Sequence, residues 1–191
     1  MALSRADWTE AALLALVRDG LAGVAVESLA RSLDATKGSF YWHFADRAEL
    51  IVATLELYEQ RETTEVIARI QAIPDPRERL TALASYAYAG VAAPSAAAGV
   101  LAAASDPRVA PVLTRVTRTR LAFIERLYIE LGVAQDHAAR QARLAYALYL
   151  GIGGLRRADP DGDPTGGARD AYLDLAVEMM MAPDREPGTR Q

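Results

Sequence analysis

Apolar residues recur every three or four positions along most of this chain of 191 residues, a spacing typical of α-helices that bury one face. In the first such segment Trp8, Ala12, Ala15 and Leu16 fall on one side of the expected helix. Alternating runs of Val, Ile, Thr and aromatic residues, which would indicate β-strands, are hard to find. The sequence therefore predicts an all-α fold.

Capping residues and helix breakers predict where the helices begin and end. Ser4, with Asp7 three residues later, is placed to cap the first helix, and Gly20 is placed to end it. Thr36 is placed to cap a short helix that begins at Lys37. The expected helices run from the Ser4 cap to Gly20 and then cover 26–33, 37–44, 47–72, 77–92, 95–104, 109–131, 135–157 and 168–182.

Composition narrows the class of protein further. Hydrophobic residues make up 51% of the chain, enough to bury a sizeable core. The absence of cysteine excludes disulfides, thiolate zinc sites and a cysteine nucleophile, and it is typical of a reducing compartment. The segment 1–20 lacks the pattern of a signal peptide, and the uncharged segment 86–105 is too weakly apolar for a membrane span. We therefore expect a cytoplasmic protein without a membrane partner.

Two short helices joined by a tight turn, at 26–44, have the dimensions that place the second helix in the major groove of DNA. A small core is predicted from five apolar residues of this segment, namely Leu29, Ala30, Leu33, Phe40 and Phe44. The side chains left to face outward are Lys37, Gly38, Ser39, Trp42 and His43. This segment is the candidate DNA-binding element.

Net charge gives no general attraction to nucleic acid, because the chain carries a formal charge of -4. Residues 1–50 hold five Lys or Arg against seven Asp or Glu. The stretch 37–44, however, has Lys37 and His43 and no acid, and Lys37 is the only lysine beside 20 arginines. Any attraction to DNA must therefore be local.

The stretch 20–50, GLAGVAVESLARSLDATKGSFYWHFADRAEL, resembles the DNA-binding region of the tetracycline-repressor (TetR) family. The family pattern runs through LA, a turn, KG-small-apolar-Y-x-H-F and a basic residue before a leucine. The resemblance implies base contacts from Lys37, Gly38, Ser39 and Trp42 and phosphate contacts from Tyr41, His43 and Arg47; Thr36 completes the predicted DNA-binding set. Two departures are Asp34 at the turn position usually held by glycine, and Glu27 near the start of the second helix.

The resemblance also implies the organisation of the rest of the chain. We expect a DNA-binding domain at 1–46, a helical ligand-binding and dimerisation domain at 47–183, and a flexible tail at 184–191. Candidate ligand contacts are the aromatic residues of the central helices, which otherwise belong to the core: Tyr58, Tyr86, Tyr88, Phe123, Tyr128, Tyr146 and Tyr149. Leu144 lies on the same apolar face as the candidate dimer contacts, which are Leu148, Ile152, Leu155, Tyr172, Leu175 and Met179.

These features predict a homodimeric transcriptional repressor that binds a palindromic DNA operator and is released by a small, largely apolar effector. One alternative is a DNA-binding regulator without an effector. Another is an all-helical enzyme with a carboxylate site, because the two histidines, His43 and His137, lie on different elements and common metal or nucleophile constellations are absent. We expect no catalytic residues, no cofactor and no metal.

Overall fold

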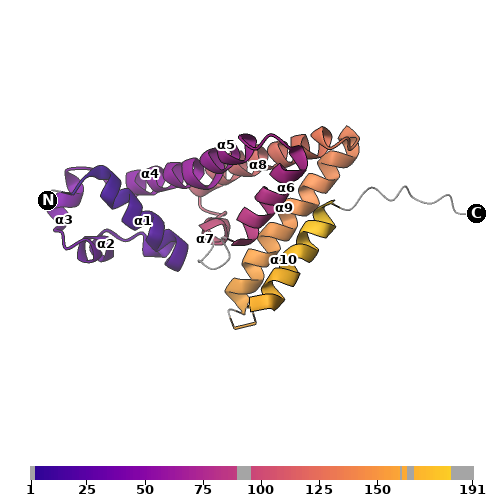
Figure 1. Cartoon of the computed structure of the whole chain (residues 1–191). Coiled ribbons are helices and arrows are strands. Elements are labelled where there is room, and N and C mark those ends of the chain that lie inside the picture. The colour runs from indigo at the N-terminus through magenta and orange to yellow at the C-terminus, as the bar shows by residue number, and fades with distance from the viewer. Residues whose placement is uncertain (1–2, 90–95, 160, 163–165, 182–191) are drawn as a thin grey trace, which may run out of the picture. The chain divides into compact units, whose positions relative to one another are not determined.

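A computed structural model of the chain describes residues 3–89, 96–159, 161–162 and 166–181 (Figure 1). These residues form helices and connecting turns, with no strand among them, so the predicted all-α fold is confirmed. The elements are α1 (Arg5–Asp19), a 3-10 turn η1 (Gly20–Gly23), α2 (Val26–Ser32), α3 (Lys37–Tyr41), α4 (Arg47–Glu59), a π-helical segment η2 (Gln60–Thr64), α5 (Glu65–Gln71), α6 (Pro76–Ala89), α7 (Ala96–Ala102), α8 (Val109–Glu130), α9 (Gln135–Ala158) and α10 (Gly166–Met181).

The helix ends confirm the predicted caps. The backbone N–H of Ser4 donates to the Asp7 carboxylate over 2.7 Å, and the N–H of Asp7 donates back to the Ser4 hydroxyl over 3.3 Å. Gly20 ends α1 with a φ of 68°, a conformation that glycine adopts without steric cost. The Thr36 hydroxyl accepts from the N–H of Ser39 over 3.2 Å and so begins α3.

The predicted continuous helix over 47–72 is interrupted by one π-helical turn. Along α4 the buried positions step by four residues, from 50 to 54 to 58, but the next buried position is Thr63. A regular α-helix would have turned Arg61 or Glu62 inward at that point. The wider turn leaves Arg61 exposed and restores the apolar face at Val66 and Ile70.

The chain divides into two compact units, one formed by residues 1–67 with 93–119 and the other by 68–92 with 120–191. The expected functional boundary between 1–46 and 47–183 stays a prediction. The predicted tail, 184–191, lies outside the described residues.

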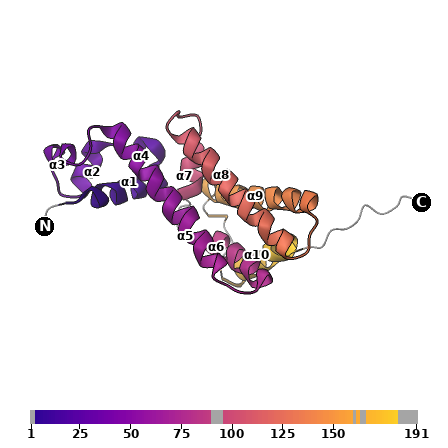
Figure 2. The same cartoon turned by 90° about the horizontal axis from the view of Figure 1, so that it is seen from above.

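In the first unit, α1, α2 and α3 gather around the start of α4 (Figures 1 and 2). Trp8 and Phe40 are fully buried, and their rings meet edge to face with centroids 5.4 Å apart. Phe44 stacks on the other side of Phe40 at 5.5 Å. Burying each such aromatic side chain contributes about 1.5–3 kcal/mol, so α3 is anchored to α1 from within.

The core of the first unit also draws on α7 and α8, which contribute Val100, Val109, Val112 and Val116. At Gly99 in α7 the two backbones nearly touch, because a Cβ built there would lie 2.7 Å from the carbonyl oxygen of Leu16 in α1. Although they are distant in sequence, α7 and α8 therefore share one core with α1 to α4.

In the second unit α6 packs against α10. The hydroxyl of the buried Tyr128 donates to the backbone carbonyl of Met180 over 2.9 Å, and Arg79 pairs with Glu130 over 2.6 Å. Within the described part of the chain, no helix combines the length and the apolar character that a membrane crossing requires.

Candidate nucleic-acid interface

The short helix α3 presents the predicted outward face. Phe40 is buried, whereas Trp42 at the end of the helix is 88% exposed and Tyr41 is 61% exposed. Leu29 and Ala30 of α2 are buried with Phe40 and Phe44, and Leu33 is partly buried against them. The remaining predicted DNA contacts of this segment are exposed or partly exposed: Thr36, Lys37, Gly38, Ser39 and His43.

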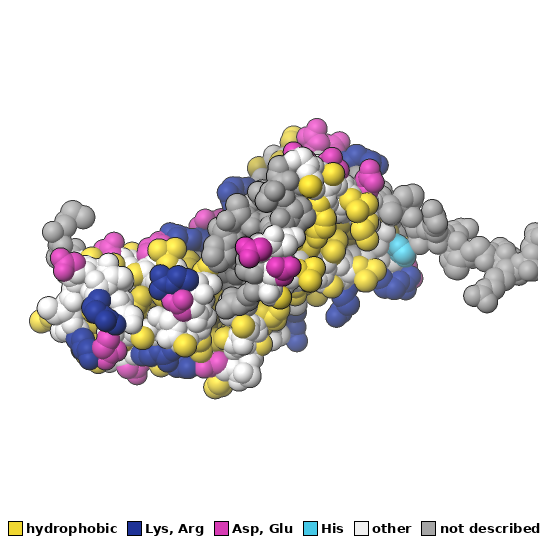
Figure 3. Space-filling model, turned by 90° about the horizontal axis from the view of Figure 1, so that it is seen from below, with side chains coloured by type: hydrophobic (Ala, Val, Ile, Leu, Met, Phe, Trp, Pro, Cys, Tyr) yellow, Lys and Arg dark blue, Asp and Glu magenta, His cyan; other side chains and the backbone are white. Residues whose placement is uncertain are grey.

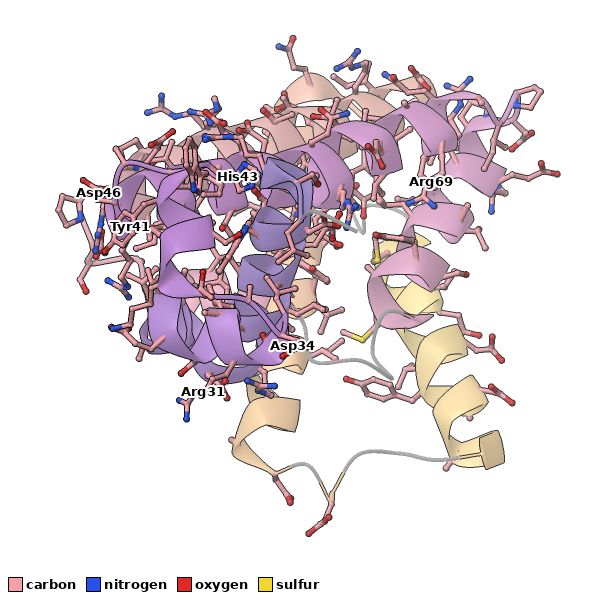
Figure 4. The ribbon with its side chains drawn as sticks, turned by 90° about the vertical axis from the view of Figure 1, so that its left-hand side faces the viewer. Arg31, Asp34, Tyr41, His43, Asp46 and Arg69 are labelled. Atoms are coloured by element: carbon pink, nitrogen blue, oxygen red, sulfur yellow. The ribbon has the colours of Figure 1, made fainter. Side chains whose placement is uncertain are left out.

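The turn between α2 and α3 depends on Asp34, which adopts a φ of 50°. An aspartate reaches this left-handed conformation at modest cost. The N–H of Ala35 then donates to the carbonyl of Ala30 over 2.8 Å and closes the turn. Asp34 therefore takes the left-handed turn position at which the resemblance implied a glycine, and Figure 4 labels it near Arg31.

The far end of α3 is held by side chains from two other helices. Arg5 of α1 donates to the backbone carbonyl of His43 over 2.5 Å and to the Glu49 carboxylate over 2.9 Å. Its guanidinium also lies 4.1 Å from the centre of the Phe44 ring. Glu49 in turn accepts from the N–H of Ala45 over 2.7 Å. This network holds the chain at His43, and Figure 4 labels Tyr41, His43 and Asp46 on this side of the molecule.

The roles of Arg5 and Glu49 in this network were not predicted from the sequence. The spacing of Asp46 and Glu49 is that of an N-terminal cap, and the N–H of Glu49 does donate to the Asp46 carboxylate over 2.9 Å. Donation from Ala45 and then from Arg5 lowers the pKa of Glu49, so the carboxylate is charged at neutral pH. No local pattern indicates the contact of Arg5 with His43, because 38 residues separate them.

Arg47, implied to hold a phosphate, lies half-buried at the start of α4. Its Nε donates to the carbonyl oxygen of Val24 over 2.5 Å and its Nη2 to that of Leu21 over 2.6 Å. The side chain thereby ties α4 to the segment between α1 and α2. A phosphate contact from Arg47 remains a prediction.

Lys37, the first residue of α3, already has an acidic partner within the helix pair. Its Nζ lies 2.5 Å from Oε1 of Glu27 in α2. The hydrogen bond from Lys37 is the main reason why the pKa of Glu27 lies below its usual value. The exposed cation at the start of α3 is therefore balanced by a carboxylate.

The predicted ligand contacts are distributed over both units. Tyr58 is buried in the core of the first unit. In the second unit, Tyr146 stacks on Tyr149 at 6.0 Å, and Tyr128 donates its hydroxyl to a backbone carbonyl. Phe123 is buried there, and Tyr86 lies 5.3 Å from the guanidinium of Arg69. The side chain of Tyr88 lies outside the described residues.

The predicted dimer contacts differ in exposure. Ile152 is 4% exposed within the single chain and packs in its core. Leu148 and Tyr172 are partly exposed. Among the described side chains of α9 and α10, the most exposed large apolar ones are Leu144 (71%), Leu155 (69%), Leu175 (53%) and Met179 (63%). No group of three or more histidine, aspartate or glutamate side chains among the described residues is arranged to hold a metal ion.

Comparison with known proteins agrees with this geometry. The sequence profile of the "Bacterial regulatory proteins, tetR family" matches residues 9–54. No curated protein matches the sequence of the chain.

Solved structures of regulators have the same fold. A TetR-family regulator from Agrobacterium tumefaciens superposes with a TM-score of 0.75 at 19% identity, over 90% of this chain and 96% of that one. A TetR-family regulator from Cytophaga hutchinsonii gives 0.75 at 18% identity, over 97% and 100% of the two chains. NemR from Escherichia coli in its reduced form gives 0.74 at 18% identity, over 92% and 94%. Residues 9–54 thus match the tetR-family profile, and the chain has the fold of solved TetR-family regulators.

Proposed function

We propose that the protein is a repressor that binds a palindromic operator as a homodimer and leaves it when a small, largely apolar molecule binds. The observation that carries the proposal is the outward face of α3, where Trp42 and Tyr41 project from a helix anchored by Phe40. Trp42 and Tyr41 together place two highly exposed aromatic side chains on one short helix, where a partner can cover both. A DNA major groove accommodates one such helix for each half-site.

Dimerisation is supported by exposed apolar residues on the last two helices. Leu144, Leu148, Gly151 and Leu155 are spaced four, three and four residues apart along α9, so they share one face of that helix. Leu175 and Met179 are similarly one turn apart on α10. Figure 3 shows hydrophobic side chains gathered on the face that it presents. A second copy of the chain would remove such side chains from water and place two recognition helices about 34 Å apart.

Release by an effector is supported by the aromatic residues of the second unit. The rings of Tyr146 and Tyr149 lie together, and Arg120 lies 6.0 Å from the centre of the Tyr149 ring. An apolar molecule that contains aromatic or carbonyl groups suits such surroundings. To act, it must bind more tightly to the conformation that does not bind DNA; a preference of about 1.4 kcal/mol weakens operator binding tenfold at most.

A regulator without an effector is the second candidate. It is favoured by Tyr58, Phe123, Tyr128 and Tyr146, all less than 9% exposed, because buried aromatic side chains usually serve the core. We propose no catalytic activity for either candidate, and we place both in the cytoplasm, as the absence of cysteine suggests.

The test begins with the operator, selected by the purified chain from a pool of random duplexes. Sedimentation should give a dimer at the concentrations that bind DNA, and a monomer there would contradict the proposal. A thermal-shift screen then identifies small molecules that raise the melting temperature. Each hit is titrated with and without operator: linkage requires operator to weaken ligand binding by the same factor as ligand weakens operator binding. Equal ligand affinity in both conditions would favour the regulator without an effector.

A further inference from the structure

Glu27 is the acidic side chain closest to the only lysine of the chain. It lies in the first turn of α2, and its carboxylate pairs with Lys37 over 2.5 Å. The side chains are 60% and 57% exposed, respectively. Exposed ion pairs contribute little to folding stability. The Glu27–Lys37 pair therefore acts mainly on a molecule that approaches the surface of α2 and α3, the helix pair.

The charges of the helix pair balance. Residues 26–44 contain two carboxylates, Glu27 and Asp34, against two basic residues, Arg31 and Lys37. Arg31 lies close enough to Glu27 to lower its pKa as well, although less than Lys37 does. A DNA phosphate that approaches the start of α3 thus meets an ammonium that already has a carboxylate partner.

We infer that Glu27 is a specificity-determining residue, which withholds Lys37 from DNA phosphates and thereby weakens binding to non-operator DNA more than binding to the operator. Every duplex offers phosphates, and a phosphate must displace the Glu27 carboxylate and withstand its negative charge. Every duplex also contains base-edge acceptors, such as guanine O6 and N7. Only the operator places one of them at the position where Glu27 holds the Lys37 ammonium. Discrimination of this kind depends on an unfavourable interaction with the wrong partner. The inference rests on the DNA-binding function.

The experiment compares the full chain with its Glu27→Gln variant on two fluorescent duplexes, the selected operator and a scrambled duplex of equal length. In the variant Lys37 becomes free to contact a phosphate. Each added phosphate contact steepens the logarithmic salt dependence of affinity by about 0.9. We expect this steeper dependence on the scrambled duplex alone. When salt rises from about 50 to about 200 mM, the affinity of the variant for that duplex should fall about threefold more than the affinity of the unchanged protein does. The ratio of operator to non-operator affinity should decrease.

Asp34→Asn is the matched control, because it removes one carboxylate from the same helix pair. Asparagine tolerates the φ of 50° found there. If only the loss of negative charge matters, both variants will strengthen binding to both duplexes alike, and the inference is wrong. We expect Asp34→Asn to strengthen binding to both duplexes alike, and we do not expect this of Glu27→Gln.

A double variant tests whether the effect passes through Lys37. In the Lys37→Ala background, Glu27→Gln should no longer change the salt dependence on the scrambled duplex. A change that persists there would overturn the inference. If the unchanged protein binds no duplex, the DNA-binding function itself fails; if it selects an operator but Glu27→Gln leaves both salt slopes unchanged, only the role of Glu27 fails.

Discussion

The guanidinium of Arg47 donates to the backbone carbonyl of Val24, 23 residues earlier, and so joins the first residue of α4 to the segment that precedes α2. A second bond reaches the carbonyl of Leu21. An Arg47→Ala variant removes both bonds, although the Leu21 carbonyl still accepts from the backbone N–H of Val24 over 3.3 Å. Since hydrogen bonds to charged groups contribute about 1.5–3 kcal/mol each, and this site is only half-buried, we expect a total loss of about 2 kcal/mol of unfolding free energy.

The measurement for Arg47 is urea unfolding, combined with the salt dependence of operator binding. A phosphate contact predicts that the salt slope falls by about one in Arg47→Ala, with stability unchanged. The internal hydrogen bonds predict instead that Arg47→Ala lowers the unfolding free energy and leaves the salt slope unchanged. A lower salt slope without loss of stability would show that Arg47 leaves these carbonyls to bind DNA.

Trp42→Ala should change DNA recognition and leave folding intact. The side chain is 88% exposed, so its removal should alter the unfolding free energy by no more than about 0.5 kcal/mol. Operator binding should weaken by about 1–3 kcal/mol, with altered preference among operator variants. Selection from random duplexes with both proteins checks this outcome. An unchanged selected sequence and affinity would remove Trp42 from the base-contacting set.

Leu155→Glu should separate the proposed dimer without unfolding the chain. Leu155 is 69% exposed on α9, and a buried, unpaired carboxylate in a subunit interface is strongly unfavourable. Leu14→Glu provides a control of equal exposure, 70%, on α1. Sedimentation should give a monomer for the first variant and a dimer for the second. If both remain dimeric, α9 does not form the interface at this position.

Gly99→Ala should destabilise the first unit. The added methyl group would meet the Leu16 carbonyl at 2.7 Å, and backbone cannot move aside as a side chain can. Overpacking of this kind costs about 1–3 kcal/mol. Gly154→Ala is the contrasting change, because no atom lies within 4 Å of the new methyl group and α9 should gain about 0.5–1 kcal/mol. Equal effects of the two substitutions on urea unfolding would contradict the close approach of α7 and α1.

Asp106, in the turn before α8, should make stability depend on acid pH. Arg108 donates to this carboxylate from its side chain and its backbone and lowers the pKa of Asp106 from 3.8 to about 2. Because the folded pKa is depressed, the stabilisation is complete above about pH 4 and is lost as pH falls towards 2. In Asp106→Asn, unfolding over this range should take up fewer protons, by up to about one. An unchanged pH dependence would mean that the pair does not persist in solution.

The sequence allowed accurate prediction of features that arise between near neighbours. The caps at Ser4 and Thr36, the tight turn at Asp34 and the outward direction of Trp42 all follow from residue type and helical spacing. Partners that lie far apart in the sequence could not be predicted. The contact of Arg5 with His43 joins segments whose proximity only the folded chain creates.

Residue type alone was also insufficient where helical faces had to be assigned. Ile152 and Leu155 were predicted to share one role, but the first is buried and the second is exposed. Three residues on a helix span about 300°, which leaves the two side chains about 60° apart, so the boundary of a face can pass between them. Only the packing of neighbouring helices decides such a boundary.

The π-helical turn at Gln60–Thr64 has a consequence for comparing this chain with its relatives. It is equivalent to a single residue inserted into an α-helix, since its buried positions step by five rather than four. A relative with an unbroken helix should therefore align with one gap between positions 60 and 64. An alignment without that gap would rotate every later position of the helix by about 100° and match Val66 and Ile70 to solvent-facing residues.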